Sequence, residues 1–299
     1  MSTANNKSIP YYPGCSQTVT NRAYDISSRS VARELGLELK EIEDWNCCGA
    51  TTYLSLDEKQ ALVLSARNLA IAETVYGNGG GDLVTICNGC YVALRKANLY
   101  LGSDEKLHTF IRSALKAGGM DYTGTVKVRH FLDVIVNDIG EEKVRTRVKK
   151  PLEGLKVAAY SGCQLGRPFV DVEDPEFPTM MDTLLEWLGA EVVNFPYKAK
   201  CCGGMIMTTQ RDVGLRLTGT ILQNAKVNGA DCVATACPLC QINLEGYQAD
   251  AGSAIKGECD IPVLYFTQLM GIAFDLQEKE LALKDNLTSY DVAVAGRGQ

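Results

Sequence analysis

Short apolar runs alternate with helical patterns along the second half of the chain. Four runs are expected to form strands: residues 156–160, 191–195, 231–236 and 261–266. Between the first two runs, apolar residues recur at positions i, i+3, i+4 and i+7 from 181 to 188, which predicts an amphipathic helix. A second helix is expected over residues 211–227. This alternation predicts βαβ units and a parallel sheet.

The first half repeats this order. The expected elements are a strand before Cys15, a helix over 20–35, an extended run over 39–45, a helix over 56–75 and a strand over 82–86. Residues 101–150 are mixed and charged, and we expect them to hold helices and the connection between the halves. The prediction is an α/β protein of two similar Rossmann-like parallel-sheet domains, residues 1–150 and 151–299, the second ending in a polar tail.

Composition narrows the class of protein. Apolar residues make up 46% of the 299 residues and charged residues 22%, which is enough to bury a core. The net charge of −6 argues against a nucleic-acid binder. No run approaches the roughly 18 apolar residues of a transmembrane segment, and the first residues lack the apolar core of a signal peptide. We therefore expect a cytoplasmic protein.

Cysteine is the residue that carries chemistry here. Of 12 cysteines, ten form two sets with one order: a single Cys, an adjacent pair, then C-x-x-C. The sets are Cys15, Cys47, Cys48, Cys87 and Cys90, and Cys163, Cys201, Cys202, Cys237 and Cys240. Cys232 and Cys259 have no counterpart in the first half and are expected to be core residues.

The residues around the cysteines also match. The paired motifs are Tyr12-Pro-Gly-Cys15 with Tyr160-Ser-Gly-Cys163, Asn46-Cys-Cys-Gly49 with Lys200-Cys-Cys-Gly203, and Thr85-Ile-Cys-Asn-Gly-Cys90 with Thr235-Ala-Cys-Pro-Leu-Cys240. Such a match indicates an internal duplication. Each cysteine group follows a predicted strand, and ligands of parallel α/β sheets bind beyond the carboxyl ends of the strands. We expect the thiols of each set to meet at that edge.

Several chemistries use cysteines in this way. A structural zinc site needs four ligands rather than five. A thioredoxin-like dithiol needs only the C-x-x-C, which would leave the other cysteines of each set unexplained. The run typical of a bacterial ferredoxin does not occur. An iron–sulfur cluster in each half accounts for the most cysteines, because thiolates are its usual ligands.

The doubled arrangement of single Cys, Cys-Cys-Gly and C-x-x-C resembles the duplicated cysteine-rich CCG domain. With the Tyr-Pro-Gly-Cys opening and the length, the chain is similar to the B subunits of heterodisulfide reductases. This resemblance implies two noncubane [4Fe-4S] clusters, each held by one set of five cysteines. It also implies a catalytic subunit that cleaves a disulfide between the clusters.

The resemblance further implies partners and a substrate. Electrons would arrive from a ferredoxin-like C subunit fed by a flavoprotein A subunit. In methanogens the substrate is the mixed disulfide of coenzyme M and coenzyme B (CoM-S-S-CoB), and the reaction belongs to methanogenesis. The resemblance also covers CCG domains that only transfer electrons to or from a partner flavoprotein, so a non-catalytic electron-transfer subunit is the alternative.

A few other residues are candidates for the site. Disulfide reduction needs protons, and His130 follows an apolar segment in a position that aligns with Tyr265, so it is a candidate catalytic residue. Lys198, Lys200 and Arg167 lie near cysteines in the sequence and could bind anionic groups of a substrate. The glycine-rich stretch 77–81 lacks the Lys-Ser/Thr of a phosphate loop and is expected to be a turn.

Overall fold

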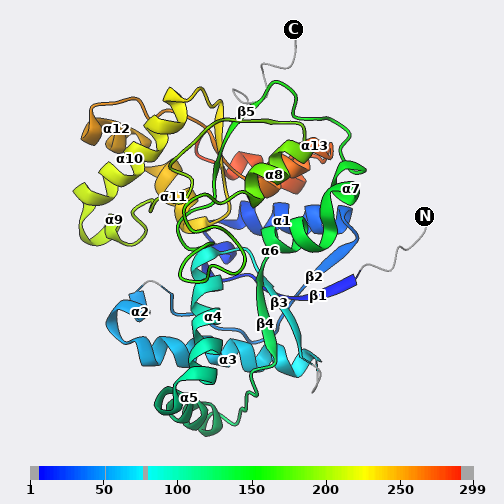
Figure 1. Cartoon of the computed structure of the whole chain (residues 1–299), viewed down its shortest axis with the longest axis vertical. Coiled ribbons are helices and arrows are strands. Elements are labelled where there is room, and N and C mark those ends of the chain that lie inside the picture. The colour runs from blue at the N-terminus through cyan, green and yellow to red at the C-terminus, as the bar shows by residue number, and fades with distance from the viewer. Residues whose placement is uncertain (1–6, 51, 77–79, 291–299) are drawn as a thin grey trace.

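Two four-stranded parallel sheets, one in each half, form the framework of the molecule (Figure 1). The computed structural model describes residues 7–50, 52–76 and 80–290. The strand order is β2-β1-β3-β4 in the first sheet and β6-β5-β7-β8 in the second. The identical order and the parallel pairing confirm the predicted α/β fold and the duplication.

The first half runs from β1 to α7. Its elements are β1 Lys7–Tyr12, a 3₁₀ turn Cys15–Thr18, α1 Arg22–Glu34, β2 Leu37–Glu41, α2 Thr52–Leu56, α3 Glu58–Tyr76, β3 Gly81–Thr85, α4 Asn88–Ser103, α5 Glu105–Ala117, β4 Val126–His130, α6 Phe131–Asp133, the π-helix η3 Val134–Ile139 and α7 Gly140–Arg145. Of the glycine-rich stretch, residues 77–79 lie outside the described residues.

The second half repeats the order with shorter elements. They are β5 Lys156–Tyr160, α8 Met180–Trp187, β6 Glu191–Val192, α9 Ile206–Thr209, α10 Arg211–Val227, β7 Cys232–Thr235, α11 Pro238–Gly246, α12 Gln248–Ile255, β8 Val263–Tyr265, α13 Phe266–Ala273, α14 Glu278–Leu281 and a 3₁₀ turn Leu283–Asp285.

Several predicted elements differ in their bounds from the observed ones. The extended run expected over 39–45 is observed as β2 and ends at Glu41. The helix expected over 56–75 is observed as α3 and begins at Glu58, because the Asp57 carboxylate accepts a hydrogen bond from the backbone N–H of Gln60 (3.2 Å); Leu56 ends the separate helix α2. The strand expected over 191–195 is shorter. Only Glu191 and Val192 pair with β5, and Pro196, which has no backbone N–H to donate, follows soon after.

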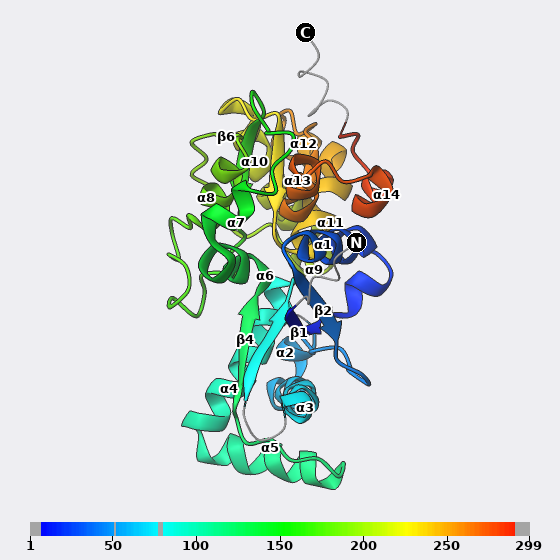
Figure 2. The same cartoon turned by 90° about the vertical axis from the view of Figure 1, so that its right-hand side faces the viewer.

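The two halves share two hydrophobic clusters, each with buried residues from both halves. Helix α1 of the first half packs against α13 and α14 of the second, and Figure 2 shows α1 close to α11 and α13. In return, α8 of the second half packs against α6, η3 and α7 of the first. Buried residues from both halves, including Val31, Phe131, Leu184 and Phe266, belong to one cluster. These helix–helix contacts between the halves hold the two sheets in a fixed relation.

Candidate functional site

The cysteines lie at the carboxyl ends of the strands, as predicted. Cys15 follows β1, the pair Cys47-Cys48 follows β2, and Cys87 follows β3. The second half has the same placement after β5, β6 and β7. Since parallel strands end at one edge of a sheet, three loops bring five thiols together in each half.

A tyrosine in each half connects two of these loops. The Tyr12 hydroxyl donates a hydrogen bond to the carbonyl of Asn46 (2.9 Å), the residue before Cys47. The Tyr160 hydroxyl donates in the same way to the carbonyl of Lys200 (2.6 Å), the residue before Cys201. The tyrosine of the opening motif therefore fixes the distance between the single cysteine and the adjacent pair.

The glycine before each single cysteine makes room for a thiol. Gly14 and Gly162 have φ of 88° and 74°, which favours glycine. A Cβ atom at Gly14 would lie 2.9 Å from the Cys90 Sγ, and one at Gly162 would lie 3.3 Å from the Cys240 Sγ. These glycines let the first loop of each half pass close to the last cysteine of the same set.

The loops that carry the adjacent cysteines are also built alike. The Ser65 hydroxyl donates to the carbonyl of Cys48 (2.8 Å), and the Thr218 hydroxyl donates to the carbonyl of Cys202 (2.9 Å). Gly49 and Gly203 follow with φ of 76° and 96°. In both halves, a helix on the sheet face holds the loop in place.

Each C-x-x-C begins a helix. Cys87 and Cys237 are the N-cap residues of α4 and α11, and Cys90 and Cys240 lie in the first turn. All four are buried. A helix N-terminus favours negative charge close to it, so these four sulfurs lie where thiolates that bind a positively charged metal group would be stabilised.

The sulfur atoms are spaced as ligands of a common metal group. The Sγ–Sγ distances are 3.6 Å for Cys15 and Cys47 and 3.4 Å for Cys48 and Cys90. Cys202 and Cys240 are 3.5 Å apart. Two thiolates bound at about 2.3 Å to one tetrahedral metal are roughly 3.8 Å apart.

The pKa values of neighbouring thiols within each set differ widely. Hydrogen bonds from the thiols of Cys15 and Cys48 lower the pKa of Cys47 to about 2, whereas contact with Cys47 raises the pKa of Cys48 to about 12. The Cys163 thiol likewise lowers the pKa of Cys201 to about 6. Five neighbouring sulfurs therefore share few negative charges unless positive ions compensate them.

The two sets meet between the halves. Contact with Cys237 raises the pKa of Cys87, and the same contact helps to lower the pKa of Cys237. The Asn88 amide donates across the interface to the carbonyl of Ser161 (2.8 Å). A cavity of about 220 Å³ opens beside the second set. Its lining includes Cys163, Cys201, Cys202, Cys237 and Cys240, with Ser55 and Asn88 from the first half.

Unpaired polar atoms gather around this region. Among the described residues, nine buried side-chain nitrogen or oxygen atoms have no hydrogen-bond partner. Six of them belong to residues beside the cysteines or at the end of β4: Gln17, Asn88, His130, Ser161, Thr235 and Gln241. Because buried polar groups are nearly always paired, this concentration indicates that the region between and around the two sets binds a polar group.

The donor set fits iron–sulfur clusters. The donors of both sets are all cysteine sulfurs, and neighbouring Sγ atoms within the sets lie 3.4–3.6 Å apart. Such spacing suits a group with several metal centres, and thiolates favour iron–sulfur clusters.

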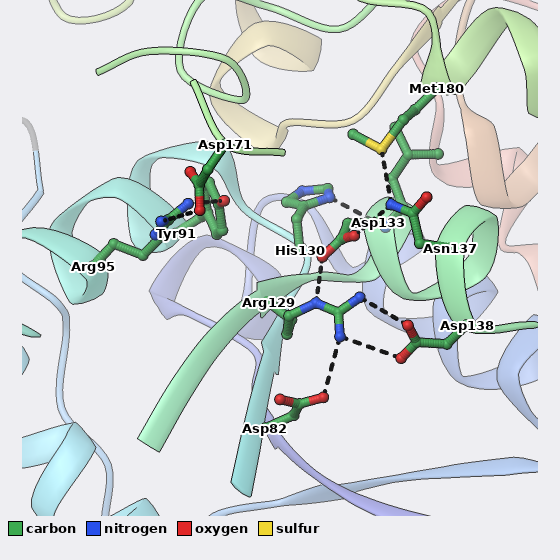
Figure 3. A network of polar contacts seen from close by, with 11 residues as sticks. Asp82, Tyr91, Arg95, Arg129, His130, Asp133, Asn137, Asp138, Asp171 and Met180 are labelled. Carbon is green, nitrogen blue, oxygen red and sulfur yellow. Dashed lines mark hydrogen bonds and ion pairs between the residues drawn. The ribbon is translucent and has the colours of Figure 1, made fainter. Parts of the chain in front are cut away.

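His130 lies at the carboxyl end of β4, in the interior (Figure 3). Its Nδ1 accepts a hydrogen bond from the backbone N–H of Leu132 (3.2 Å), and burial lowers its pKa to about 4. The Tyr265 side chain, at the matching end of β8, stacks on Tyr24 with ring centroids 4.0 Å apart. The hydroxyl of Tyr265 accepts from the amide of Asn21 (2.6 Å).

The predicted basic residues lie outside the cavity lining. The Lys198 ammonium pairs with Asp182, and the Arg167 guanidinium pairs with Glu176 at 2.6 Å. Lys200 is exposed, and its carbonyl accepts from Tyr160. Their role in substrate binding stays a prediction.

Some residues of the site were not identified from the sequence. Asn21, Tyr24 and Asn88 make hydrogen bonds between the halves. Met205, which its position after the second Cys-Cys-Gly led us to expect in the core, is half-buried and lines the cavity. The position of Asn88 between two cysteines was the only signal available. Cys232 and Cys259 are buried and do not line this cavity.

Comparisons with known proteins agree with this geometry. A family model described as a cysteine-rich domain, CCG, matches residues 9–95 and again residues 157–245. A solved structure, a hypothetical protein from Helicobacter pylori, superposes with a TM-score of 0.75 at 14% identity. That match covers 95% of this chain and 52% of the other, so this chain spans about half of that structure.

Curated relatives match over nearly the whole length. The 8-methylmenaquinol:fumarate reductase membrane anchor subunit of Wolinella succinogenes is 36% identical, covering 94% of this chain and 97% of the relative. The B subunit of the ferredoxin/F420H2-dependent CoB-CoM heterodisulfide reductase of Methanosarcina acetivorans is 31% identical, covering 93% of each chain.

In the part of the chain that the structure describes, no helix has both the length and the apolar character needed to span a bilayer. The repeated domain match and these full-length relatives agree with the doubled cysteine site. The chain belongs to the CCG cysteine-rich domain family, carries the domain twice, and is a relative of the B subunits of heterodisulfide reductases.

Proposed function

We propose that this protein is the catalytic iron–sulfur subunit of a heterodisulfide-reductase-type complex. In this proposal each set of five cysteines holds a noncubane [4Fe-4S] cluster. A small disulfide binds between the clusters, accepts two electrons and two protons, and leaves as two thiols. The carrying observation is the meeting of the two sets between the halves, beside a cavity with lining residues from both.

An electron-transfer role is common to the relatives, which are subunits of reductase complexes. Partner subunits are therefore part of the proposal. We infer a ferredoxin-like C subunit as the electron donor and a flavoprotein A subunit behind it. The substrate class is a small disulfide. CoM-S-S-CoB corresponds to the name of the Methanosarcina relatives.

A few residues of the chain have defined roles in the proposed disulfide reduction. When bound, the clusters would supply the electrons that reduce the disulfide. Cys87 and Cys237 bring the two sets together, while Asn88 and Ser55 contribute polar groups from the first half to the cavity.

The Wolinella relative supports a second candidate. Its name assigns it to a fumarate reductase, in which the disulfide chemistry has no stated part. A chain similar to it could transfer electrons without binding a substrate. In that case the cavity beside the second set would hold water only.

Reduction of a small disulfide by the iron-loaded chain, with reduced methyl viologen as electron donor, separates the candidates. The catalytic proposal predicts turnover that is lost in Cys240→Ala, a buried cysteine of the second set, together with iron from that set. Cys232→Ala is the matched control, because Cys232 is buried but lies outside both sets, and it should retain turnover. Full iron content in the native chain without turnover would contradict the catalytic proposal and favour electron transfer.

A further inference from the structure

The cavity of about 220 Å³ beside the second cysteine set has a neutral lining. Apart from the five thiols, none of the described residues that line it is charged. Three apolar and three neutral polar side chains complete the lining: Met205, Ile206, Leu239, Ser55, Asn88 and Gln164. A cluster held by the thiols would take the sulfur side, so these six side chains would border a molecule bound beside it.

Asn88 brings a hydrogen-bond acceptor to this cavity. The residue is 1% exposed, and its Nδ2 donates to the carbonyl of Ser161 (2.8 Å). Its Oδ1 is buried as well, and it has no hydrogen-bond partner among the described residues. Because a buried amide oxygen is nearly always paired, Asn88 favours a ligand with a hydroxyl, N–H or S–H group and disfavours an anionic one.

The Asn88 amide of the first half lies close to a sulfur of the second. A Cβ atom at Gly162 would lie 3.2 Å from the Nδ2 of Asn88 and 3.3 Å from the Sγ of Cys240. Both groups therefore border one point of the loop before Cys163. A ligand that reaches a metal centre at Cys240 passes within reach of this amide.

A second neutral amide crosses the interface in the opposite direction. A Cβ atom at Gly89 would lie 3.6 Å from the Oε1 of Gln164 and 3.7 Å from the Sγ of Cys87. Gln164 follows the single cysteine of the second half, yet its side chain reaches the C-x-x-C of the first. The cavity thus meets the junction of the two sets with carboxamides only.

The basic residues predicted from the sequence leave this cavity without a counter-charge. Lys198 is paired with Asp182 and Arg167 with Glu176, and neither cation lines the cavity. Lys200 is exposed and lies outside the lining too. A carboxylate, sulfonate or phosphate that entered here would lose its hydration without gaining a cation.

We propose that the disulfide substrate has uncharged arms, and that one arm enters this cavity with its hydrogen-bond donor on the Oδ1 of Asn88 and its carbon atoms against Met205 and Ile206. This inference rests on the proposed function, because it names the class of disulfide. The reaction consumes one R–S–S–R, two protons and two electrons from the partner subunits, and gives two R–SH. Alkyl disulfides with hydroxyl or amide groups fit this cavity.

Disulfides with arms of equal length separate charge from size. The bis(2-hydroxyethyl), bis(2-aminoethyl) and bis(2-carboxyethyl) disulfides are compared on the iron-loaded chain with reduced methyl viologen, and the iron-free chain gives the background rate. We expect kcat/KM to be at least about tenfold higher for the hydroxyethyl compound than for either charged one.

A cation added to the lining should shift this preference. Met205→Lys should raise kcat/KM for the carboxyethyl compound relative to the hydroxyethyl compound about tenfold. Thr208→Lys is the matched control, because it adds the same charge at an exposed position of α9 outside the lining. This control should leave the ratio unchanged.

Removal of the amide tests the acceptor. In Asn88→Ala, the ratio of kcat/KM for bis(2-hydroxyethyl) disulfide to that for diethyl disulfide, which has no hydroxyl group, should fall about fivefold. A purely structural role of Asn88 would lower kcat/KM for both compounds equally and leave the ratio unchanged.

The outcomes separate this inference from the proposed function. Turnover of a charged disulfide that equals or exceeds that of the hydroxyethyl compound, or an unchanged ratio in Asn88→Ala, would overturn the inference alone. Full iron without turnover of any disulfide contradicts the proposed function, and thiol binding then decides the inference. In an EPR-monitored titration, 2-mercaptoethanol should act at lower concentration than 3-mercaptopropionate. The reverse order, equal concentrations or no response to either thiol would refute the neutral site.

Discussion

At the scale of single residues, hydrogen bonding and close packing explain the motif around each single cysteine. Tyr12 and Tyr160 bind the carbonyl before the adjacent pair, and Gly14 and Gly162 leave space for a thiol. These residues do not ligate, yet they set where the ligands lie. They occur in both halves because each half must bring a single cysteine, an adjacent pair and a C-x-x-C close together.

The role of Gly14 leads to a first prediction. Gly14→Ala would bring a Cβ to 2.9 Å from the Cys90 Sγ at a backbone φ of 88°, so we expect reduced iron in the first set and a stability loss of about 1–3 kcal/mol. Iron analysis and thermal unfolding measure these effects.

Gly229→Ala is the matched control for this substitution. Its φ is 81°, but no atom lies within 4 Å of an added Cβ. Gly229→Ala should therefore cost stability through strain alone and keep its iron. Equal iron content in the two variants would show that the contact with Cys90 is unimportant.

At the scale of elements, β4 joins the first sheet to the site through a network of charges. Arg129 is buried near the end of this strand and pairs with Asp133, Asp138 (3.1 Å) and Asp82 (3.3 Å) (Figure 3). The side chain of Asp133 is only 6% exposed, so its charge depends on this arginine. The network fixes the turn from β4 into α6 and with it the ring of His130.

Removal of the arginine gives a second prediction. Arg129→Met leaves the carboxylate of Asp133 buried without its cation, and we expect a loss of about 3–5 kcal/mol in the free energy of unfolding. The exposed pair of Arg112 and Asp121 provides the control, and Arg112→Met should cost at most about 1 kcal/mol. Urea unfolding measures the free energy of unfolding of both variants. Equal losses in the two variants would contradict the claim that the buried ion pair contributes more than the exposed one.

The same network predicts a dependence of stability on pH. Burial alone would raise the pKa of Asp133, but hydrogen bonds from Arg129 and Asn137 hold it below 3.8. Since the folded pKa lies below the unfolded one, the stabilising contribution is present above about pH 4 and is lost as pH falls through the folded value. Asp133→Asn should flatten this acid limb. An unchanged slope of unfolding free energy against pH below 4 would contradict the assignment.

At the scale of the whole molecule, helices of each half pack against helices of the other half, and the two halves share hydrophobic core. The division into residues 1–150 and 151–299 describes the repeat, and it stays a proposal as a description of domains. Phe266 of the second half contacts Tyr24 and Phe131 of the first, with centroids 6.0 and 6.5 Å apart. Because the two sets meet at the interface, loss of this core would also separate the two cysteine sets.

A shared core predicts one unfolding transition. The two tryptophans, Trp45 and Trp187, lie in different halves, so Trp187→Phe and Trp45→Phe give emission from one half each. The urea midpoints of these two variants should coincide. Adding Phe266→Ala should lower both midpoints together and reduce the free energy of unfolding by about 3–5 kcal/mol. Separate midpoints for the two halves would show that the domains unfold independently.

Sequence periodicity predicted most elements and the edge at which the cysteines gather. It missed β4 as a strand, because Val-Lys-Val-Arg-His mixes charged residues with apolar ones and Arg129 is buried only through its aspartates. It also could not show that α1 packs on α13 or that Cys87 meets Cys237, since these contacts join residues far apart in the chain. Local patterns carry no information about such pairings.

Anaerobic analysis of iron, sulfide and zinc, combined with EPR before and after addition of a thiol under oxidising conditions, tests the central claim most directly. Two [4Fe-4S] clusters predict about eight irons and eight sulfides per chain, with an EPR signal that depends on the thiol. Stoichiometric zinc without iron would contradict the account.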